Sequence, residues 1–260
     1  MAGFSAPLLA IFIDASSSYR NSETIWLMLS SNIINDAAIF LYLLIIGVFL
    51  LGKYFSRKGD VVVWRTMQAQ IDMLQKVVFA DFANDLNDNH RVTLFRYKKW
   101  SWSRFKTLTG LVESIKKGSW PGSGWLVPVI RSGHTGKDTN VIFWAPDSGG
   151  KAEGVAGRSW SSDHSVDYSD LPNITKNSNK ENKDKYCQRC NMERWILDDY
   201  CEKGRSLARH ILAYPVRTRS GERWGVLVFD SMSENGVDAK SAQDAFEKVI
   251  DPIGILLEGV

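Results

Sequence analysis

Apolar residues fill one uninterrupted stretch near the start of the chain. Residues 37–55 read AAIFLYLLIIGVFLLGKYF and carry no charged side chain before Lys53. At a rise of about 1.5 Å per residue, a helix of this length would cross the hydrocarbon core of a bilayer. The pattern therefore predicts one transmembrane helix over residues 37–55.

Basic residues are distributed unequally around this stretch. Lys53, Arg57 and Lys58 end or follow it, whereas Arg20 is the only basic residue before it. Because basic residues favour the cytoplasmic side, we expect residues 1–36 to form an extracytoplasmic segment and the C-terminal part to be cytoplasmic. The chain would then be a single-pass protein of the cell inner membrane, with the lipid bilayer as a partner.

A helical period follows in residues 56–88, which we interpret as a connector. Its apolar positions are spaced alternately by three and four residues, as in a short heptad seam. Two interpretations fit this spacing: a parallel coiled coil that joins two chains, or an amphipathic helix that packs on its own domain. The seam consists of Trp64, Met67, Ile71, Leu74 and Val78.

Residues 89–260 change to the pattern of strands and turns. The sequence RVTLFRYKK alternates apolar and polar residues, which predicts a half-buried strand, and GWLVPVIRSG and NVIFWAP predict two more. Residues 105–118 fit either a short helix or a hairpin excursion. Residues 173–186 are rich in Asn, Lys and acidic residues, which predicts a solvated loop.

The C-terminal third carries the clearest elements. A helix is expected over MERWILDDYCEKG, ending at Gly204. Two apolar strands follow, joined by the turn Arg219-Ser220-Gly221-Glu222. The last segment, SAQDAFEKVIDPIGILLE, predicts an amphipathic helix with Ser241 as its N-cap. This order indicates an α+β fold, an antiparallel sheet covered by its end helices.

Two segments give the chain a specific resemblance. EGVAGRSWSSDHSVDYSDLPNI, at residues 153–174, and the later AYPVRTRSGERWGVLVFDS together resemble the GAF domain of sensory proteins. The likeness covers residues 62–257. It implies a GAF-like antiparallel sheet flanked by helices, with a small-molecule cleft on one side, and it implies a homodimer paired through the flanking helices.

The same resemblance places the cleft around residues 153–172. Gly154 and Gly157 would turn the backbone beside the cleft, Arg158 and Trp160 would begin a short helix forming its floor, and residues 161–170 would be a lid. Alternatively, the cleft is filled by its own side chains, as in members used for dimerisation alone. The expected ligand-binding residues are Trp144, Arg158, Trp160, Tyr168, Asp170 and Tyr214.

Three cysteines are the remaining candidates for chemistry. Cys187, Cys190 and Cys201 have the spacing C-x2-C-x10-C, of which the first part suits thiolate ligands of zinc. A fourth ligand could come from His210 or His164 only through the fold. Zinc binding, a redox-responsive pair and inert thiols all stay open, and the sequence assigns no cofactor.

Composition limits the functional classes. The 260 residues carry a net charge of +3, with 44% apolar and 23% charged residues, so a folded domain is expected and nucleic acid is not an expected partner. The cyclic-nucleotide, bilin and methionine-sulfoxide signatures of GAF proteins have no convincing copy, and neither phosphate-binding loops nor hydrolase motifs occur. We therefore expect no enzymatic activity.

The combined prediction is a membrane-anchored cytoplasmic sensor. Its GAF-like domain would bind a small molecule or a protein partner and relay the signal through its end helices to a downstream protein. A second hypothesis is a membrane-disrupting effector triggered by a signal nucleotide. A third is a redox or zinc-dependent enzyme that uses Cys187, Cys190 and Cys201.

Overall fold

A computed structural model describes residues 40–52, 61–85, 89–102, 105, 108–132, 141–147 and 152–258. The chain divides into two compact units, residues 1–58 and residues 59–260. The second unit contains the whole sheet and both hydrophobic cores.

The first unit contains a helix over residues 40–52, within the stretch predicted to cross the membrane. Most of its large apolar side chains are exposed, from Phe40 to Leu51. No helix within the described ranges is both long and apolar enough to cross a membrane. The remainder of the predicted span, residues 37–39 and 53–55, lies outside the described residues, as does the N-terminal segment 1–36.

The second unit is built on a six-stranded sheet in the order β3-β2-β1-β6-β5-β4, with every adjacent pair antiparallel. The predicted α+β class with an antiparallel sheet is confirmed. The strands are β1 His90–Lys98, β2 Trp125–Arg131, β3 Phe143–Trp144, β4 Val166–Tyr168, β5 His210–Arg217 and β6 Arg223–Ser231.

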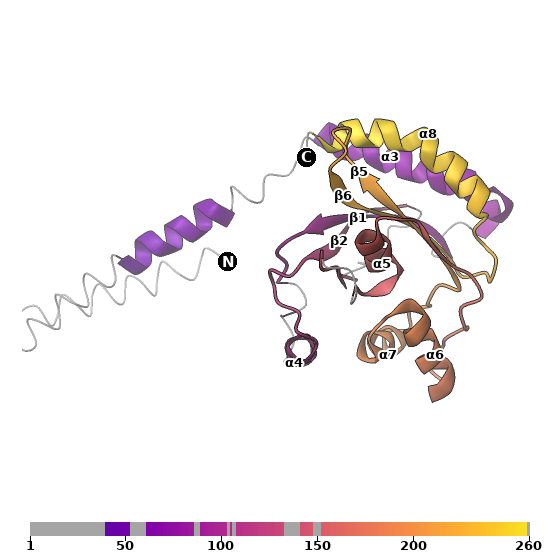
Figure 1. The fold of residues 1–260 in the computed structure, drawn as a ribbon, viewed down its shortest axis with the longest axis horizontal. Coiled ribbons are helices and arrows are strands. Elements are labelled where there is room, and N and C mark those ends of the chain that lie inside the picture. Colours follow the sequence, from indigo (N-terminus) through magenta and orange to yellow (C-terminus); the bar gives the residue numbers. More distant parts are fainter. Residues whose placement is uncertain are drawn as a thin grey trace, which may run out of the picture. The chain divides into compact units, whose positions relative to one another are not determined.

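Helices cover both faces of this sheet. Figure 1 shows α3 and α8 side by side over one face, with α4, α5, α6 and α7 on the opposite side. The helices are α3 Val61–Val78, α4 Leu108–Lys117, α5 Gly154–Ser162, α6 Lys180–Cys190, α7 Arg194–Glu202 and α8 Ala239–Leu257, with a short 3-10 helix over Ala80–Asp85.

The central strand β1 is more buried than its alternating sequence predicts. Val92 and Leu94 pack into the core under α3 and α8, and Phe95 packs into a second core on the other face. Thr93 is buried as well. Both faces of β1 are therefore covered along residues 92–95, whereas Lys98 at the end of the strand is exposed.

The connector helix α3 packs on its own domain. Met67, Ile71 and Leu74, which the heptad interpretation would place between two chains, are 0%, 0% and 1% exposed in the core beneath α8. Gln75 reinforces this packing, because its amide donates to the backbone oxygen of His90 at 2.5 Å. The structure thus supports the amphipathic-helix alternative for these residues.

The prediction of a solvated loop over residues 173–186 is wrong in its second half. Residues 180–190 form α6, because Asn179 caps the helix by accepting from the backbone nitrogen of Asn182 at 2.9 Å and Glu181 lies in the first turn. Tyr186 and Cys190 form the buried side of this polar helix. Two buried anchors were enough to pack a helix that its composition alone does not predict.

The C-terminal elements are largely as predicted. The β5–β6 hairpin and the helix over residues 194–202 are confirmed, with Gly204 at a φ of 63° just after the helix. The N-cap of α8 is Asp238 and not Ser241, since the Asp238 carboxylate accepts from the backbone nitrogens of Lys240 and Ser241. Carboxylates are also favoured at a helix N-terminus by the helix dipole.

Candidate functional site

A cavity of about 100 Å³ lies between the sheet and the layer formed by α5, α6 and α7. One water molecule needs about 10–15 Å³ of such volume, so the cavity has room for a small ligand. Its wall is mostly apolar, with polar groups from β1, β2, β6, α6 and α7. The lining includes Arg91, Thr93, Phe95, Arg131, Phe143, Gly154, Val155, Ala156, Tyr186, Cys190, Met192, Tyr200, Ala208, Val228 and Asp230.

The first turn of α5 forms one wall of the cavity. Gly154 has a φ of 69°, and a Cβ there would lie 2.7 Å from the ring of Phe143. A side chain at this position would therefore be strained and would also clash with the opposite wall. The glycine allows Val155 and Ala156 to approach the sheet closely, which sets the width of the cavity on this side.

Charged groups gather at one end of the cavity. Arg91 on β1 and Asp230 on β6 are register partners, and the guanidinium Nε of Arg91 donates to the Asp230 carboxylate at 2.5 Å. Arg131, at the end of β2, lies in the same lining. Charge-assisted hydrogen bonds of this kind are stronger than neutral ones. The charged groups of the described lining are thus two guanidinium groups and one carboxylate.

Two tyrosines add hydroxyl groups to the cavity. Burial raises the pKa of Tyr200, and the nearby Asp230 carboxylate raises it further. Three guanidinium groups lower this pKa by a smaller amount, those of Arg91, Arg205 and Arg131. Burial also raises the pKa of Tyr186, whose hydroxyl donates to the backbone oxygen of Ala208 at 3.0 Å. Both hydroxyls therefore stay protonated at neutral pH. The Tyr186 hydroxyl already donates its one proton to Ala208, so Tyr200 is the tyrosine that can donate to a ligand.

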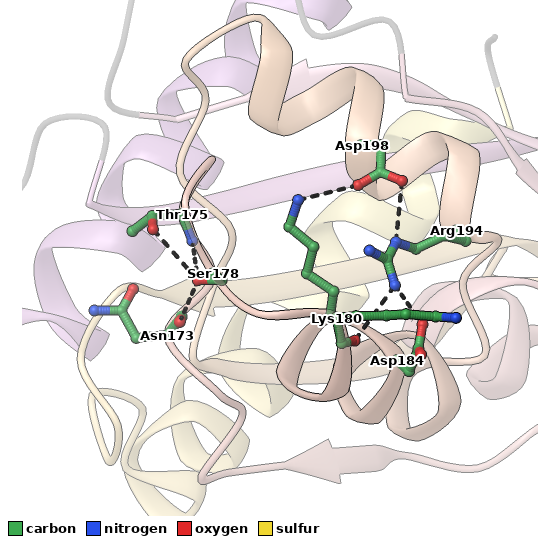
Figure 2. Close-up of polar contacts among 8 residues, drawn as sticks. Asn173, Thr175, Ser178, Lys180, Asp184, Arg194 and Asp198 are labelled. Atoms are coloured by element: carbon green, nitrogen blue, oxygen red, sulfur yellow. Dashed lines mark hydrogen bonds and ion pairs between the residues drawn. The ribbon is translucent and has the colours of Figure 1, made fainter.

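An ion-pair network joins the two helices that carry these tyrosines. Figure 2 shows Arg194 of α7 between Asp184 of α6 and Asp198 of its own helix. The Lys183 amine reaches the Asp198 carboxylate at 3.2 Å. An isolated, exposed ion pair contributes only about 0–1 kcal/mol to stability, but side chains that share ion-pair partners hold one another in a defined geometry. The network fixes α6 against α7 and so positions Tyr186 relative to Tyr200.

A small turn leads the chain into α6. In Figure 2 the Ser178 hydroxyl faces Asn173 and Thr175, accepting from the backbone nitrogen of Thr175 at 2.9 Å. Asn179 then caps the helix. Polar residues that suggest a loop in the sequence thus serve as the turn and cap of a helix that lines the cavity.

None of the six predicted ligand-binding residues is among the described lining residues of the cavity. Arg158 donates to the hydroxyl of Tyr168, and its guanidinium carbon lies 5.5 Å from the centre of that ring. Trp160 is buried and stacks on Tyr97, with ring centres 4.2 Å apart. The Arg223 guanidinium lies 4.7 Å from the centre of the Trp160 ring.

The other three predicted residues have separate roles. The Trp144 indole donates to the Ser123 hydroxyl at 2.8 Å, and the backbone oxygen of Asp170 accepts from Arg189 at 2.6 Å. Tyr214 packs on the opposite face of the sheet and stacks on Phe246 of α8. Side chains alternate along β5, so Ala213 faces the cavity layer and Tyr214 faces the end helices.

The predicted lid over residues 161–170 contains an edge strand. Val166, Asp167 and Tyr168 form β4, which pairs with Ala213, Leu212 and Ile211 of β5. The Asp167 carboxylate also meets the His210 ring nitrogen at 2.9 Å. Backbone pairing to β5 integrates this segment into the sheet.

The cysteines do not form a metal site in the structure. Within the described ranges, no group of three or more His, Cys, Asp or Glu side chains could hold a metal ion. Burial raises the pKa of Cys187 to about 11 and that of Cys190 to about 12, and burial also raises the pKa of Cys201. The thiols therefore stay protonated at neutral pH, whereas nucleophilic chemistry needs the thiolate.

The sequence interpretation missed the charged end of the cavity. Arg91 begins the alternating strand sequence, and Asp230 ends the apolar run GVLVF. Charged residues at the two ends of strands are common, so neither one stands out alone. Only the antiparallel register of β1 and β6 pairs Arg91 with Asp230. A prediction of which strands pair, and in which register, could have identified these two residues as neighbours.

Comparisons with known proteins concern the fold. No protein-family model matches the sequence, and a search of curated proteins found no match. Similar solved structures include a GAF domain, with 12% identity, a TM-score of 0.39 and coverage of 71% of this chain and 73% of that chain. A type II free methionine-R-sulfoxide reductase from Thermoplasma acidophilum has 14% identity, a TM-score of 0.39 and coverage of 75% and 95%.

A third similar structure is the nlh2 GAF domain of A. aeolicus in an inactive state. It has 14% identity and a TM-score of 0.32, with coverage of 76% of this chain and 91% of that chain. The similar structures thus include both a reductase and GAF domains. The antiparallel sheet and flanking helices give this chain a GAF-like fold, and its site must be argued from its own residues.

Proposed function

We propose that the chain is a sensor whose GAF-like domain binds a small anionic molecule in the cavity between the sheet and α5–α7. The observation that carries the proposal is the charged end of this cavity, where Arg91 and Arg131 accompany the single carboxylate of Asp230 in the described lining. Guanidinium groups match the geometry of carboxylates and oxyanions, and the Tyr200 hydroxyl adds a neutral donor.

The size of the cavity narrows the ligand class. Sites for drug-sized ligands measure about 300–1,000 Å³, whereas this cavity measures about 100 Å³. A small carboxylic acid or inorganic oxyanion suits the cavity better than a nucleotide. The apolar wall formed by Phe95, Val155 and Val228 would then contact the aliphatic part of an organic acid.

The proposed role is binding and not catalysis. The only thiol in the described lining is Cys190, and burial raises its pKa to about 12, so it is a poor nucleophile at neutral pH. The cavity supplies hydrogen-bond donors that can recognise an anion. We therefore retain a sensory role for the domain.

A signal from the cavity could reach the end helices through β1 and β6. Phe95 and Val228 face the cavity layer, while their neighbours Leu94 and Leu227 pack under α3 and α8. A ligand that shifts these strands would shift the packing of the helices. In this proposal the apolar segment 37–55 anchors the domain to the cytoplasmic face of the inner membrane.

The output would pass through a homodimer to a downstream protein. Met73 and Val77 of α3 are about half exposed beside a groove of about 370 Å³ that they share with α8. Asp244 and Lys248 of α8 border the same groove. Opposite charges beside an apolar strip are self-complementary about a twofold axis, so a second copy of the chain suits this surface.

Native mass spectrometry and calorimetry of the full chain in detergent would test ligand binding. We expect a small anionic adduct, or saturable binding of short carboxylates and inorganic anions. R131Q should weaken binding at least tenfold because it removes one positive charge from the cavity. R217Q is the matched control, since Arg217 pairs with Asp163 at the surface away from the cavity. Equal binding by the parent chain and R131Q would contradict the proposal.

A further inference from the structure

The connection between β1 and β2 displays an unusual amount of aromatic surface. Trp100, Trp102 and Trp120 are 62%, 65% and 63% exposed, although tryptophan is normally well buried. Helix α4 lies in the same connection and exposes Val112 and Ile115 to solvent. We call these five residues the tryptophan surface.

The exposed apolar residues of α4 form a stripe. Leu111, Val112 and Ile115 are exposed and lie at positions i, i+1 and i+4 of the helix, whereas Ser114 is buried. An ordinary surface helix has the opposite arrangement, with apolar residues inward and polar residues outward. The stripe therefore presents an apolar face to the surroundings of the domain.

Local contacts hold the tryptophans in place. The backbone nitrogen of Ser101 donates to Pro121 oxygen at 2.8 Å, which joins the two ends of the connection. Trp100 packs over Gly122, where a Cβ would lie 2.9 Å from the indole ring. Trp102 touches Phe105, which packs edge-on against the buried Trp125. The exposed rings thus belong to an ordered structure tied to the sheet.

Positive charge is concentrated in the same connection. Residues 98–120 contain six basic residues and one acidic residue, although the whole chain has a net charge of only +3. The rest of the chain is therefore net negative. Among the described residues of the connection, Lys99 and Lys116 are exposed, and Glu113 pairs with Lys116. The basic residues are Lys98, Lys99, Arg104, Lys106, Lys116 and Lys117.

We propose that the tryptophan surface docks the domain onto an anionic lipid bilayer. Tryptophan side chains favour the interface between lipid and water, and apolar helix faces insert among the head groups. Basic residues are attracted to anionic lipids by about 1 kcal/mol each near the surface. A surface that binds another protein would more commonly carry mixed charges than a net positive charge of this size.

The position of the β1–β2 connection on the sheet also favours a bilayer as the partner. The Gln75 amide reaches the start of β1 at His90, and the Gln68 amide reaches Arg131 oxygen, opposite Thr93, at 2.9 Å. Helix α3 therefore runs antiparallel to β1, and its first residue, Val61, lies toward the end of the sheet where β1 reaches Lys98.

The chain length before α3 brings this end of the domain within reach of the proposed anchor. Residues 53–60 can span at most about 30 Å when extended. If residues 37–55 lie in a bilayer, that end of the domain must stay near its surface. The docking proposal goes beyond the proposed sensor function. It rests on that proposal only for the anchor that would keep the domain near the bilayer. The apolar and basic character of the connection is independent of the anchor.

Hydrogen exchange of the full chain in nanodiscs tests the proposal. The chain is compared in discs of phosphatidylcholine alone and in discs that also contain phosphatidylserine. We expect amides of residues 99–102 and 111–120 to exchange about tenfold more slowly with phosphatidylserine, because docking excludes water from them. High salt should reduce this protection, since it screens surface attraction.

Two variants separate docking from other effects. W102S/W120S should lose the protection while the exchange of the sheet stays unchanged, because both side chains project from the fold. I255S is the matched control, since Ile255 is a large apolar residue that is 52% exposed on α8. Equal exchange in both kinds of disc would overturn the proposal. Protection in detergent that depends on chain concentration would assign the surface to a second copy, and this too would overturn it.

The same preparation distinguishes failure of docking from failure of the anchor or of the sensor. Incorporation of the chain into discs tests the anchor, and anion binding tests the sensor. If the chain stays soluble without lipid, it is mixed with phosphatidylserine vesicles and sedimented. Binding that W102S/W120S abolishes would support docking without an anchor, and no binding to these vesicles would overturn the proposal.

Discussion

At the scale of single residues, environment decides the chemistry of the cysteines and arginines. The C-x2-C spacing suggests zinc or redox chemistry, but the side chains of Cys187 and Cys190 lie among apolar groups that raise both pKa values. Arg91 and Asp230, which carry no motif, form a bonded pair in a cavity. The structure therefore shifts the candidate site from the thiols to the guanidinium groups.

The reactivity of Cys187 provides a test at this scale. With a pKa of about 11, the thiol is almost entirely protonated at neutral pH, and the thiolate fraction rises about tenfold per pH unit until about pH 11. We expect iodoacetamide labelling of the folded chain, followed by mass spectrometry at Cys187, to show this slope. The unfolded chain, with an ordinary thiol pKa, is the control and should react about a hundredfold faster near pH 8.

Fast labelling of folded Cys187 near neutral pH, levelling off below pH 8, would contradict this expectation. It would show a stabilised thiolate and would favour the redox alternative for this cysteine.

At the scale of elements, burial decides what a pattern becomes. A heptad seam in residues 64–78 suits either a coiled coil or a packed helix, and the core beneath α8 resolves the choice for α3. A polar sequence around residue 180 became α6 because of Asn179 at its start and two buried side chains. The periodicity of α3 was read correctly and the fold supplied its packing partner, whereas the polar composition of α6 predicted the wrong element.

Replacing Ile71 by alanine tests the packing of α3. Ile71 is fully buried in the core, so I71A should lower the free energy of unfolding by about 2–5 kcal/mol. Denaturant unfolding of the full chain, followed by circular dichroism, measures this loss. V62A, at a position of the same helix that is 65% exposed and outside the α3–α8 groove, is the control and should cost much less. A small effect of I71A, together with loss of dimer, would instead favour a coiled coil.

At the scale of the whole molecule, the sheet separates two surfaces with different roles. The cavity layer holds the candidate ligand site, while α3 and α8 form the opposite layer. The connection between β1 and β2 adds the tryptophan surface at one end of the sheet. The proposed ligand binding, dimerisation and lipid docking would thus use different parts of one domain.

The proposed dimer is tested by a charge placed in the groove between α3 and α8. V77E should shift the full chain from dimer to monomer in native mass spectrometry, because it buries an unpaired carboxylate between apolar side chains. The parent species should have about twice the chain mass of 29.3 kDa. I255E adds the same charge at another exposed site of the helix layer and should leave the dimer intact. A monomeric parent chain would exclude this dimer.

The sequence determined the elements that depend on local physics. Periodicity predicted the strands and the terminal helix, the turn around Gly221 predicted the β5–β6 hairpin, and the segments around residues 153–174 and 213–231 predicted a GAF-like fold. These features follow from side-chain alternation, backbone freedom at glycine, and apolar runs, all of which are readable along the chain.

Only the tertiary structure decided which residues meet. The β1–β6 register paired Arg91 with Asp230, the alternation along β5 turned Tyr214 away from the cavity, and pairing with β5 made a strand of the expected lid. The two strand pairings join residues more than forty positions apart, and a one-residue change of register would reverse every face. A site that depends on such pairings is fixed by the fold, because no local pattern encodes the partner.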